Sequence, residues 1–189
     1  MASLKRAIRR KCALAGICDD ATLVYGDGPS RAHLMVVGEA PGRDETREGR
    51  PFVGKAGRFF IGVLEDSMGM PRENIYITNV VKTWPKLPTK RGKTRKPSKD
   101  ELAFFTPYLE KEVAIVAPRV ILAVGKTAYH ALIPTGVFKH GVWYEHRGTP
   151  VMAVYHPAYI LRKGKSLKEN TAGLKNALAM VKKALLAGR

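Results

Sequence analysis

The stretch that decides the fold is LMVVGEAPG at residues 34–42. It joins an apolar run of strand length to a glycine-rich turn. Three more apolar runs rich in β-branched residues follow at 75–81, 120–124 and 151–154, with helix-length segments between them. This alternation is typical of a parallel sheet covered by helices on both faces. The sequence therefore predicts an α/β fold with three α/β/α layers and a central, mainly parallel four-stranded sheet, whose first strand is 34–37.

Helices are expected in the segments around these strands. The clearest one begins at Ser98, because Ser98 and Glu101 have the S-x-x-E spacing in which each side chain satisfies a free backbone amide. Pro118 is expected to end it. A length of 189 residues and a hydrophobic fraction of 45% suit one domain over residues 1–189. The four expected helices are 55–68, 98–116, 126–132 and 167–186.

The charge of the chain favours a polyanionic partner. Its 33 Lys and Arg residues against 16 Asp and Glu give a formal net charge of +17, more than solubility requires, and nucleic acid is the leading candidate partner. No apolar run approaches the roughly 20 residues that span a bilayer, and no signal peptide is apparent, so no membrane association is expected. With only Cys12 and Cys18, a disulfide framework is not expected, and a reducing cytoplasm fits better.

Polar residues stand at the ends of the expected strands. Glu39 lies in the turn after the first strand, Asn79 near the end of the second, the triplet Gly-Lys-Thr at 125–127 after the third, and His156 after the fourth. In open parallel sheets, ligands bind beyond the carboxyl ends of the strands. These groups are therefore expected to meet in one cleft.

Two of these residues carry groups that can act on a water molecule or on the edge of a base. A carboxylate at Glu39 can position or deprotonate a water molecule, although a solvated Glu in a glycine-rich connector is an equal alternative. The carboxamide of Asn79 offers an acceptor and two donors, which match the alternating edge of a pyrimidine. A turn-forming Asn is the alternative there.

His156 and Phe52 complete the candidate site. Pro157 restricts the backbone of His156 to extended geometry, so its ring projects from a strand end. A satisfied surface or core histidine is the commoner explanation of a lone His. Phe52 lies in a polar loop between Gly49 and Gly54, where it can stack on a base or else plug the loop into the core.

A basic loop at 82–99 carries eight Lys or Arg residues and no acid. Because it follows Asn79 directly, it is expected beside the cleft, where it can grip phosphates. A solvated charge run is the alternative. Two nucleotide-binding motifs are excluded: position 120 is Val where a P-loop ending at 125–127 needs Gly, and no GxGxxG occurs.

Four segments in register carry a resemblance to a known family: GEAPG at 38–42, GRPFVGKAG at 49–57, ITNVVK at 77–82 and HPAYILR at 156–162. Together they resemble the family 4 uracil-DNA glycosylases over roughly residues 12–162. The resemblance implies an enzyme that hydrolyses the N-glycosidic bond of uracil in DNA and so initiates base excision repair. It is expected to act as a nucleoid-associated monomer in the cytoplasm on single- or double-stranded uracil-containing DNA.

The resemblance also implies roles for individual residues. The target nucleotide of that superfamily is flipped out of the helix into a pocket. Phe52 would stack on the uracil, Asn79 would bind its N3 and O4 edge, His156 would bind O2, and Glu39 would assist the water that attacks C1′. Segment 43–45 would help to exclude the thymine methyl group. The implied uracil-binding residues are Gly38, Ala40, Phe52, Asn79 and His156, and the implied catalytic residues are Glu39, Asn79 and His156.

The expected DNA contacts combine the basic loop with the last of the four segments, residues 159–162 of which would press into the gap left in the duplex. The expected DNA-binding residues are Lys82, Lys90, Arg91, Lys93, Arg95, Tyr159, Leu161 and Arg162.

The sequence departs from the family at its iron–sulfur cluster. Members similar to this chain hold the cluster with four cysteines, two of them a closely spaced pair near the amino terminus. Here Cys12 and Cys18 are farther apart, Thr83 stands where the third is expected, and 104–106 lies near the fourth. Two thiolates do not complete such a site. No cluster, metal or other cofactor is therefore predicted, and packing around Trp84 and residues 104–105 would take over the structural role of the cluster.

Two other functions stay open from the sequence. A protein of the same fold could bind uracil or another modified base with slow or no catalysis, and the missing cysteines keep this alternative open. A hydrolase of small nucleotides is weaker, because it has no evident use for so much positive charge.

Overall fold

The computed structural model describes residues 1–17, 23–87, 93–162 and 166–187. Its centre is a sheet in the order β2-β1-β3-β5-β4. The first four strands in this order run parallel, and β4 pairs with β5 in the antiparallel direction. The strands are β1 (Leu34–Gly38), β2 (Tyr76–Asn79), β3 (Val120–Val124), β4 (Val142–His146) and β5 (Thr149–Val154).

The prediction of an α/β fold is confirmed, but the predicted number of four strands is wrong. The missed strand β4 lies at the edge of the sheet, where most of its residues are exposed or half-buried, so it has no continuous apolar run. It joins β5 through Arg147 and Gly148, whose φ angles of 51° and 81° are both in the left-handed region. Two such residues form the tight turn typical of a hairpin.

Helices cover both faces of the sheet, and the four predicted helices lie within one residue of their expected bounds. They are α3 (Lys55–Met68), α4 (Lys99–Val116), α5 (Lys126–Leu132) and α7 (Leu167–Ala187). The structure adds α1 (Ala2–Leu14), α2 (Arg43–Glu48), the 3-10 helix η2 (Arg72–Asn74) and α6 (Pro157–Arg162).

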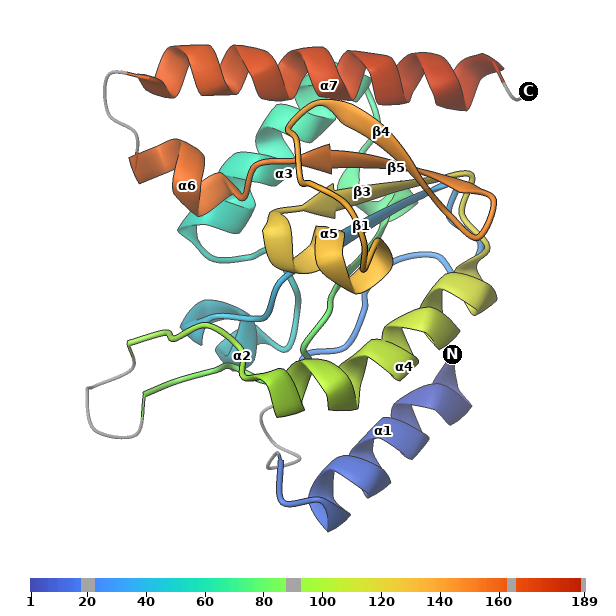
Figure 1. The fold of residues 1–189 in the computed structure, drawn as a ribbon, viewed down its shortest axis with the longest axis vertical. Helices are drawn as coiled ribbons and strands as arrows, with labels where there is room; N and C mark the ends of the chain where they lie inside the picture. The colour runs from blue at the N-terminus through green and yellow to red at the C-terminus, as the bar shows by residue number, and fades with distance from the viewer. Residues whose placement is uncertain (18–22, 88–92, 163–165, 188–189) are drawn as a thin grey trace.

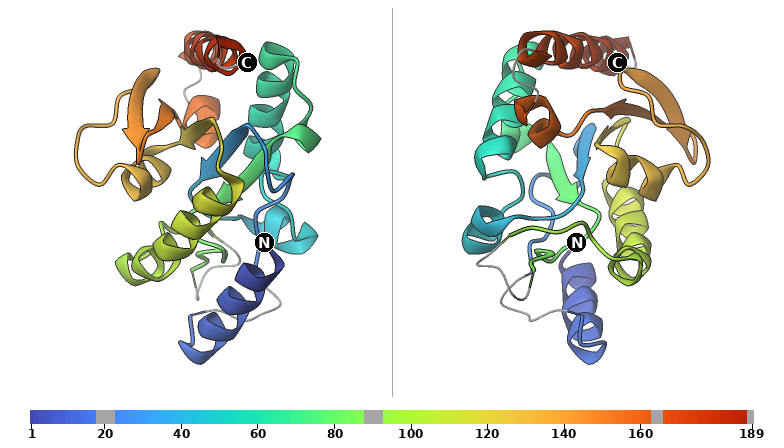
Figure 2. Two further views of the ribbon diagram at one scale, coloured as in Figure 1. Left: turned by 90° about the vertical axis from the view of Figure 1, so that its right-hand side faces the viewer. Right: turned by 60° about the vertical axis from the view of Figure 1, so that its left-hand side comes forward.

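The side chains of the central strands alternate between two cores. In β1, Met35 and Val37 belong to the core beneath α1, α4 and α5. Leu34 and Val36 belong to the core beneath α3 and α7. Figures 1 and 2 show α7 and α3 on one side of the sheet and α4 and α1 on the other. This gives the three layers, and every residue of β1 is buried.

Helix α4 begins as its sequence predicts. The Glu101 amide donates to the Ser98 hydroxyl at 3.1 Å, and the Ser98 amide donates to the Glu101 carboxylate at 2.6 Å. The helix ends at Val116, where Ala117 turns into the left-handed region just before Pro118. Across the described ranges, no helix combines the length and the apolar character needed to cross a membrane.

Candidate active site

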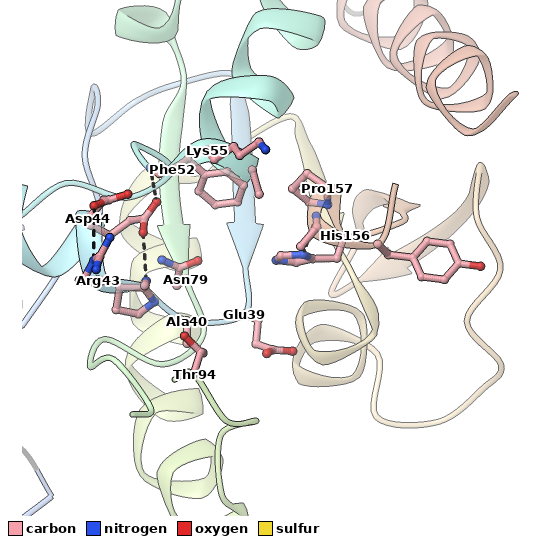
Figure 3. A pocket seen from close by; sticks show the side chains of 18 of the residues that line it. Glu39, Ala40, Arg43, Asp44, Phe52, Lys55, Asn79, Thr94, His156 and Pro157 are labelled. Atoms are coloured by element: carbon pink, nitrogen blue, oxygen red, sulfur yellow. Dashed lines mark hydrogen bonds and ion pairs between the residues drawn. The ribbon is translucent and has the colours of Figure 1, made fainter. Parts of the chain in front are cut away.

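A cavity of about 680 Å³ opens at the carboxyl ends of the parallel strands. Glu39, Phe52, Asn79 and His156 all line it, although they come from four separate segments of the chain. Figure 3 shows these four side chains around a common space. The structure therefore brings together the carboxylate, ring, amide and imidazole that the sequence singled out.

The turn after β1 and the turn after β2 are bonded to each other. The backbone amide of Val80 donates to the carbonyl of Gly38 at 2.9 Å, and that of Val81 donates to the carbonyl of Glu39 at 3.0 Å. Strand β2 ends at Asn79, two residues earlier than the apolar run suggests, and these bonds keep the chain beyond it beside the end of β1. They also fix Glu39 relative to Asn79.

Gly38 supports the pocket from behind. A Cβ atom at this position would lie 2.3 Å from Oδ1 of Asn79 and 2.7 Å from Cε2 of Phe52. Any other residue would therefore displace both side chains. Ala40, two residues on, lines the cavity itself, whereas Gly38 is not part of its wall.

Phe52 has a strained backbone and a nearly buried ring. Its φ angle is 58°, unusual for a residue with a side chain, and its ring is 7% exposed and packs 5.5 Å from the ring of Phe60. The guanidinium of Arg72 donates to the carbonyls of Pro51 at 2.6 Å and Phe52 at 3.5 Å, and it contacts Asp27 at 3.4 Å. Strain held in place by such contacts is typical of a functional loop.

A second carboxylate ties this loop to the turn after β1. The Glu45 side chain accepts hydrogen bonds from the amides of Gly42 at 3.1 Å and Gly54 at 2.6 Å. Arg43, Asp44 and Glu45 all line the cavity, and the role of this segment in excluding a thymine methyl group stays a prediction. The spacing Gly42 to Glu45 resembles a capping pair, which is the one sequence signal for this contact.

His156 presents one ring nitrogen to the cavity in a defined tautomer. Its Nδ1 lies 3.2 Å from the backbone amide of Ala158, which donates to it. The neutral ring therefore carries its proton on Nε2. Burial lowers the pKa of His156, although nearby Glu39 opposes this shift, and Arg162 lowers it further. The imidazole is therefore neutral at neutral pH, with an N–H group to donate.

Lys82, expected to contact DNA, lies elsewhere. Its side chain is 0% exposed, and its ammonium group donates to Glu112 at 2.5 Å, to the Thr78 hydroxyl at 2.7 Å and to the backbone carbonyl of Asn79 at 2.7 Å. A fully buried cation cannot reach a phosphate, so the assignment of Lys82 to DNA binding is wrong. It instead supports Asn79 from behind.

The basic loop reaches the rim of the cavity. Thr94, Arg95 and Lys96 line it, and Lys93 is exposed beside them. Arg95 makes a two-pronged contact with Glu101 at 2.7 and 2.9 Å. Lys90 and Arg91 lie outside the described residues.

Helix α6 forms the opposite rim. Tyr159 is 40% exposed and Arg162 is exposed, and both line the cavity. Leu161 is half-buried and does not line it. The ring of Tyr159 lies 4.9 Å from that of Tyr155, which stacks on His140.

The residues at the expected cluster position do not fit an iron–sulfur cluster. Cys12 is fully buried and disulfide-bonded, so it offers no thiolate, and the expectation of reduced cysteines is wrong for this residue. Thr83 is buried, and Phe104 packs edge-on against Phe105 at 4.9 Å and beside Tyr108. Within the described ranges, no three His, Cys, Asp or Glu residues are grouped as metal ligands.

Two supporting residues, Arg72 and Glu112, and the loop-bridging role of Glu45 were not found from the sequence. The triplet at 125–127 was expected in the cleft, but the contact between Thr127 and Glu39 was not. The Thr127 hydroxyl donates to the Glu39 carboxylate across 88 positions of sequence. Glu112 is 2% exposed in the middle of α4. A lone acid among apolar residues at core-facing helical positions was the one available signal for it.

The fold and the cavity define a class of protein. An α/β/α structure with a cavity at the strand ends that is lined by an amide, an imidazole, a carboxylate and an aromatic ring, with cations at its rim, has the features of a nucleobase-binding site. The family model described as the uracil DNA glycosylase superfamily matches residues 25–182. The chain belongs to this superfamily.

Individual relatives give the same result. A type-4 uracil-DNA glycosylase of Sulfurisphaera tokodaii is 36% identical over 163 residues, which cover 80% of this chain and 70% of the relative. One from Pyrobaculum aerophilum is 37% identical, over 74% of each chain. One from Thermotoga maritima is 34% identical, over 81% of this chain and 79% of the relative.

Proposed function

We propose that the protein is a uracil-DNA glycosylase that flips uracil out of DNA and hydrolyses its N-glycosidic bond. The observation that carries this proposal is the meeting of Glu39, Phe52, Asn79 and His156 around one cavity in a chain of this superfamily. The reaction needs a bound base, a stabilised leaving group and an activated water molecule. The cavity offers a side chain for each of these three requirements.

Base recognition is assigned to Asn79 and Phe52. Asn79 is 4% exposed, and its side chain is confined by Gly38, so the amide has little freedom to rotate away from the cavity. A fixed amide can accept from N3–H of uracil and donate to O4. The Phe52 ring supplies a face for stacking, because its loop is held by Arg72.

Leaving-group stabilisation is assigned to His156. As the glycosidic bond breaks, negative charge collects on the uracil ring, including O2. A neutral imidazole whose Nδ1 already accepts from Ala158 can donate Nε2–H to that oxygen. Because the lowered pKa keeps the ring neutral, this donor is available throughout the neutral range.

Water activation is assigned to Glu39. Its carboxylate lines the cavity near His156, which its charge reaches electrostatically. An ionised carboxylate at this place can orient the attacking water and stabilise the positive charge that develops on the sugar. No metal enters these steps.

DNA binding is assigned to the two rims of the cavity, with Lys93, Arg95 and Lys96 on one side and Tyr159 and Arg162 on the other. Cations at a rim grip phosphates, and α6 can occupy the space that the flipped nucleotide leaves. We place this activity at the nucleoid in the cytoplasm, carried out by a monomer in which residues 1–189 form one domain. The missing thiolates support a glycosylase without an iron–sulfur cluster, and an absorption spectrum in the visible range tests this.

The deciding experiment measures uracil release. The protein is incubated with oligonucleotides that contain uracil opposite guanine, uracil opposite adenine, uracil in a single strand, or inosine, and strand breaks after alkali are counted. We expect cleavage at uracil and a loss of about 100-fold or more in Asn79→Ala and His156→Ala. Asn176→Ala and His130→Ala, at exposed positions on other helices, serve as matched controls and should cleave like the wild type.

A further inference from the structure

We propose that Thr127, in the first turn of α5, is a positioning residue that orients the Glu39 carboxylate for water activation. The proposal rests on the function proposed above and adds a residue to it. The turn at 125–127 resembles part of a phosphate-binding motif in sequence but contributes no residue to the wall of the cavity. Its role is to hold Glu39, which does line the cavity.

The contact itself joins two neighbouring strands. The hydroxyl group of Thr127 donates a hydrogen bond to Oε2 of Glu39. Glu39 follows β1, and Thr127 follows β3, which pairs with β1 in parallel, so both residues emerge at the same edge of the sheet. One carboxylate oxygen is thus engaged, and the other stays available for a water molecule.

The position of Thr127 is fixed by its neighbours. Ala128 and Tyr129, which follow it, are both 0% exposed. The amide of Gly125 donates to the carbonyl of Val154 at 2.8 Å, which ties the turn to the end of β5. A hydroxyl group on so rigid a turn can restrict a carboxylate, because little of its own freedom remains to be lost.

The same turn also contacts His156. Gly125 has a φ angle of 91°, and a Cβ atom there would lie 3.1 Å from Cβ of His156. One short segment therefore bonds to the carboxylate through Thr127 and leaves room for the His156 side chain at Gly125.

The hydroxyl group of Thr127 has no evident role in α5, the helix in which it lies. Helix α5 has Gly125 as its N-cap, and no side chain caps it. A valine would have nearly the same shape as Thr127 at this half-buried position. The hydrogen bond to Glu39 is what a threonine adds.

The test compares Thr127→Val, which removes the hydroxyl group, with Thr127→Ser, which keeps it. Uracil release is measured under single-turnover conditions, together with affinity for uracil-containing DNA and the melting temperature. We expect Thr127→Val to lower the rate by about 10- to 100-fold, the size of effect expected for a hydrogen bond to a charged group, with DNA affinity nearly unchanged. Thr127→Ser should restore most of the rate. Thr171→Val, which removes a hydroxyl group on the far helix α7, is the matched control.

A double-mutant cycle separates positioning from general damage. If Thr127 acts through Glu39, then Thr127→Val should have little further effect in a Glu39→Gln background. Equal losses in both backgrounds, a rate within twofold of wild type for Thr127→Val, or a failure of Thr127→Ser to restore the rate would each overturn the proposal. A wild-type protein that releases no uracil would overturn the proposed function itself, whereas an active wild type with an active Thr127→Val overturns the positioning role alone.

Discussion

Two ion pairs of similar chemistry involve residues of the basic loop at 82–99, one at its start and one near its end. Lys82 and Glu112 are 0% and 2% exposed and meet at 2.5 Å, whereas Arg95 and Glu101 are 35% and 12% exposed and meet at 2.7 Å. Both join a cation of the 82–99 segment to an acid of α4. The Lys82–Glu112 pair is buried behind the cavity, and the Arg95–Glu101 pair lies at its rim.

The difference shows that burial decides what a cation can do. The Lys82 ammonium group has three acceptors at 2.5 to 2.7 Å and no access to solvent, so it holds the end of β2 against α4. Burial lowers the pKa of Lys82, and Glu112 opposes that shift. Arg95 can leave Glu101 for a phosphate because water already shields the pair. Of two basic residues in one segment, Lys82 therefore serves the fold, and Arg95 is free to serve the proposed contact with DNA.

Lys82→Met should have the largest effect on stability. It leaves Glu112 charged and buried without its partner, so we expect a loss of about 3 to 5 kcal/mol in the free energy of unfolding, measured with urea. The double variant Lys82→Met with Glu112→Leu should recover most of this loss, because an apolar pair replaces an ionic one. A loss below 1 kcal/mol in the single variant would contradict the structural role of the pair.

The pH dependence of stability extends the comparison to two half-buried histidines, His156 and His140. Burial lowers the pKa of His156 and of His140 below the usual 6.5, so the unfolded chain takes up protons at a higher pH than the folded chain does. The contribution of each is fully present above about pH 6.5 and is lost as the pH falls through the folded pKa, by at most about 1.4 kcal/mol per pH unit for each group.

The measurement is the urea-unfolding free energy between pH 8 and pH 5. His156→Gln should show a shallower decline than wild type, and His130→Gln, at an exposed position, should follow wild type. Identical slopes for wild type and His156→Gln would contradict the buried, neutral imidazole.

Loss of the exposed cations should change DNA binding in a salt-dependent way. A phosphate contact contributes about 0.9 to the slope of log affinity against log salt on duplex DNA. Lys93→Gln combined with Arg95→Gln should therefore flatten the slope by up to about 2, as measured by fluorescence anisotropy from 50 to 200 mM salt. An unchanged slope would mean that this rim does not contact phosphate, and Lys183→Gln on α7 is the control.

The smallest effect is expected for the stability of Arg95→Gln. Its ion pair with Glu101 is partly exposed, and such pairs contribute less than about 1 kcal/mol. Urea unfolding of this variant, set beside Lys82→Met, measures the contrast between the two pairs directly. A loss as large as that of Lys82→Met would show that the rim pair is structural after all.

The sequence predicts the parts of this molecule whose causes are local. The apolar runs give the parallel strands, and the polar residues that follow them give Glu39, Asn79 and His156 at one edge of the sheet. The capping box at Ser98 needs only three residues and is found where expected. The resemblance then supplies the roles of these residues.

What the sequence does not predict depends on distant partners. Lys82 belongs to a basic run and looks exposed until Glu112, 30 residues later, is seen to face it. Thr127 acts on a carboxylate 88 positions away. Strand β4 is missed in the sequence because an edge strand needs only a partly apolar pattern. Contacts between residues so far apart in the sequence can be identified only from the folded structure.

The two backbone bonds between the turns after β1 and β2 have a consequence for how such an enzyme changes. Because Val80 and Val81 donate to the carbonyls of Gly38 and Glu39, the backbone that carries the proposed base-selecting amide is bonded directly to the backbone that carries the proposed water-directing carboxylate. A substitution that shifts Asn79 to admit a different base will also displace Glu39. New substrate preferences at this site should therefore begin as slow activities and need a second change, near the carboxylate, to become fast.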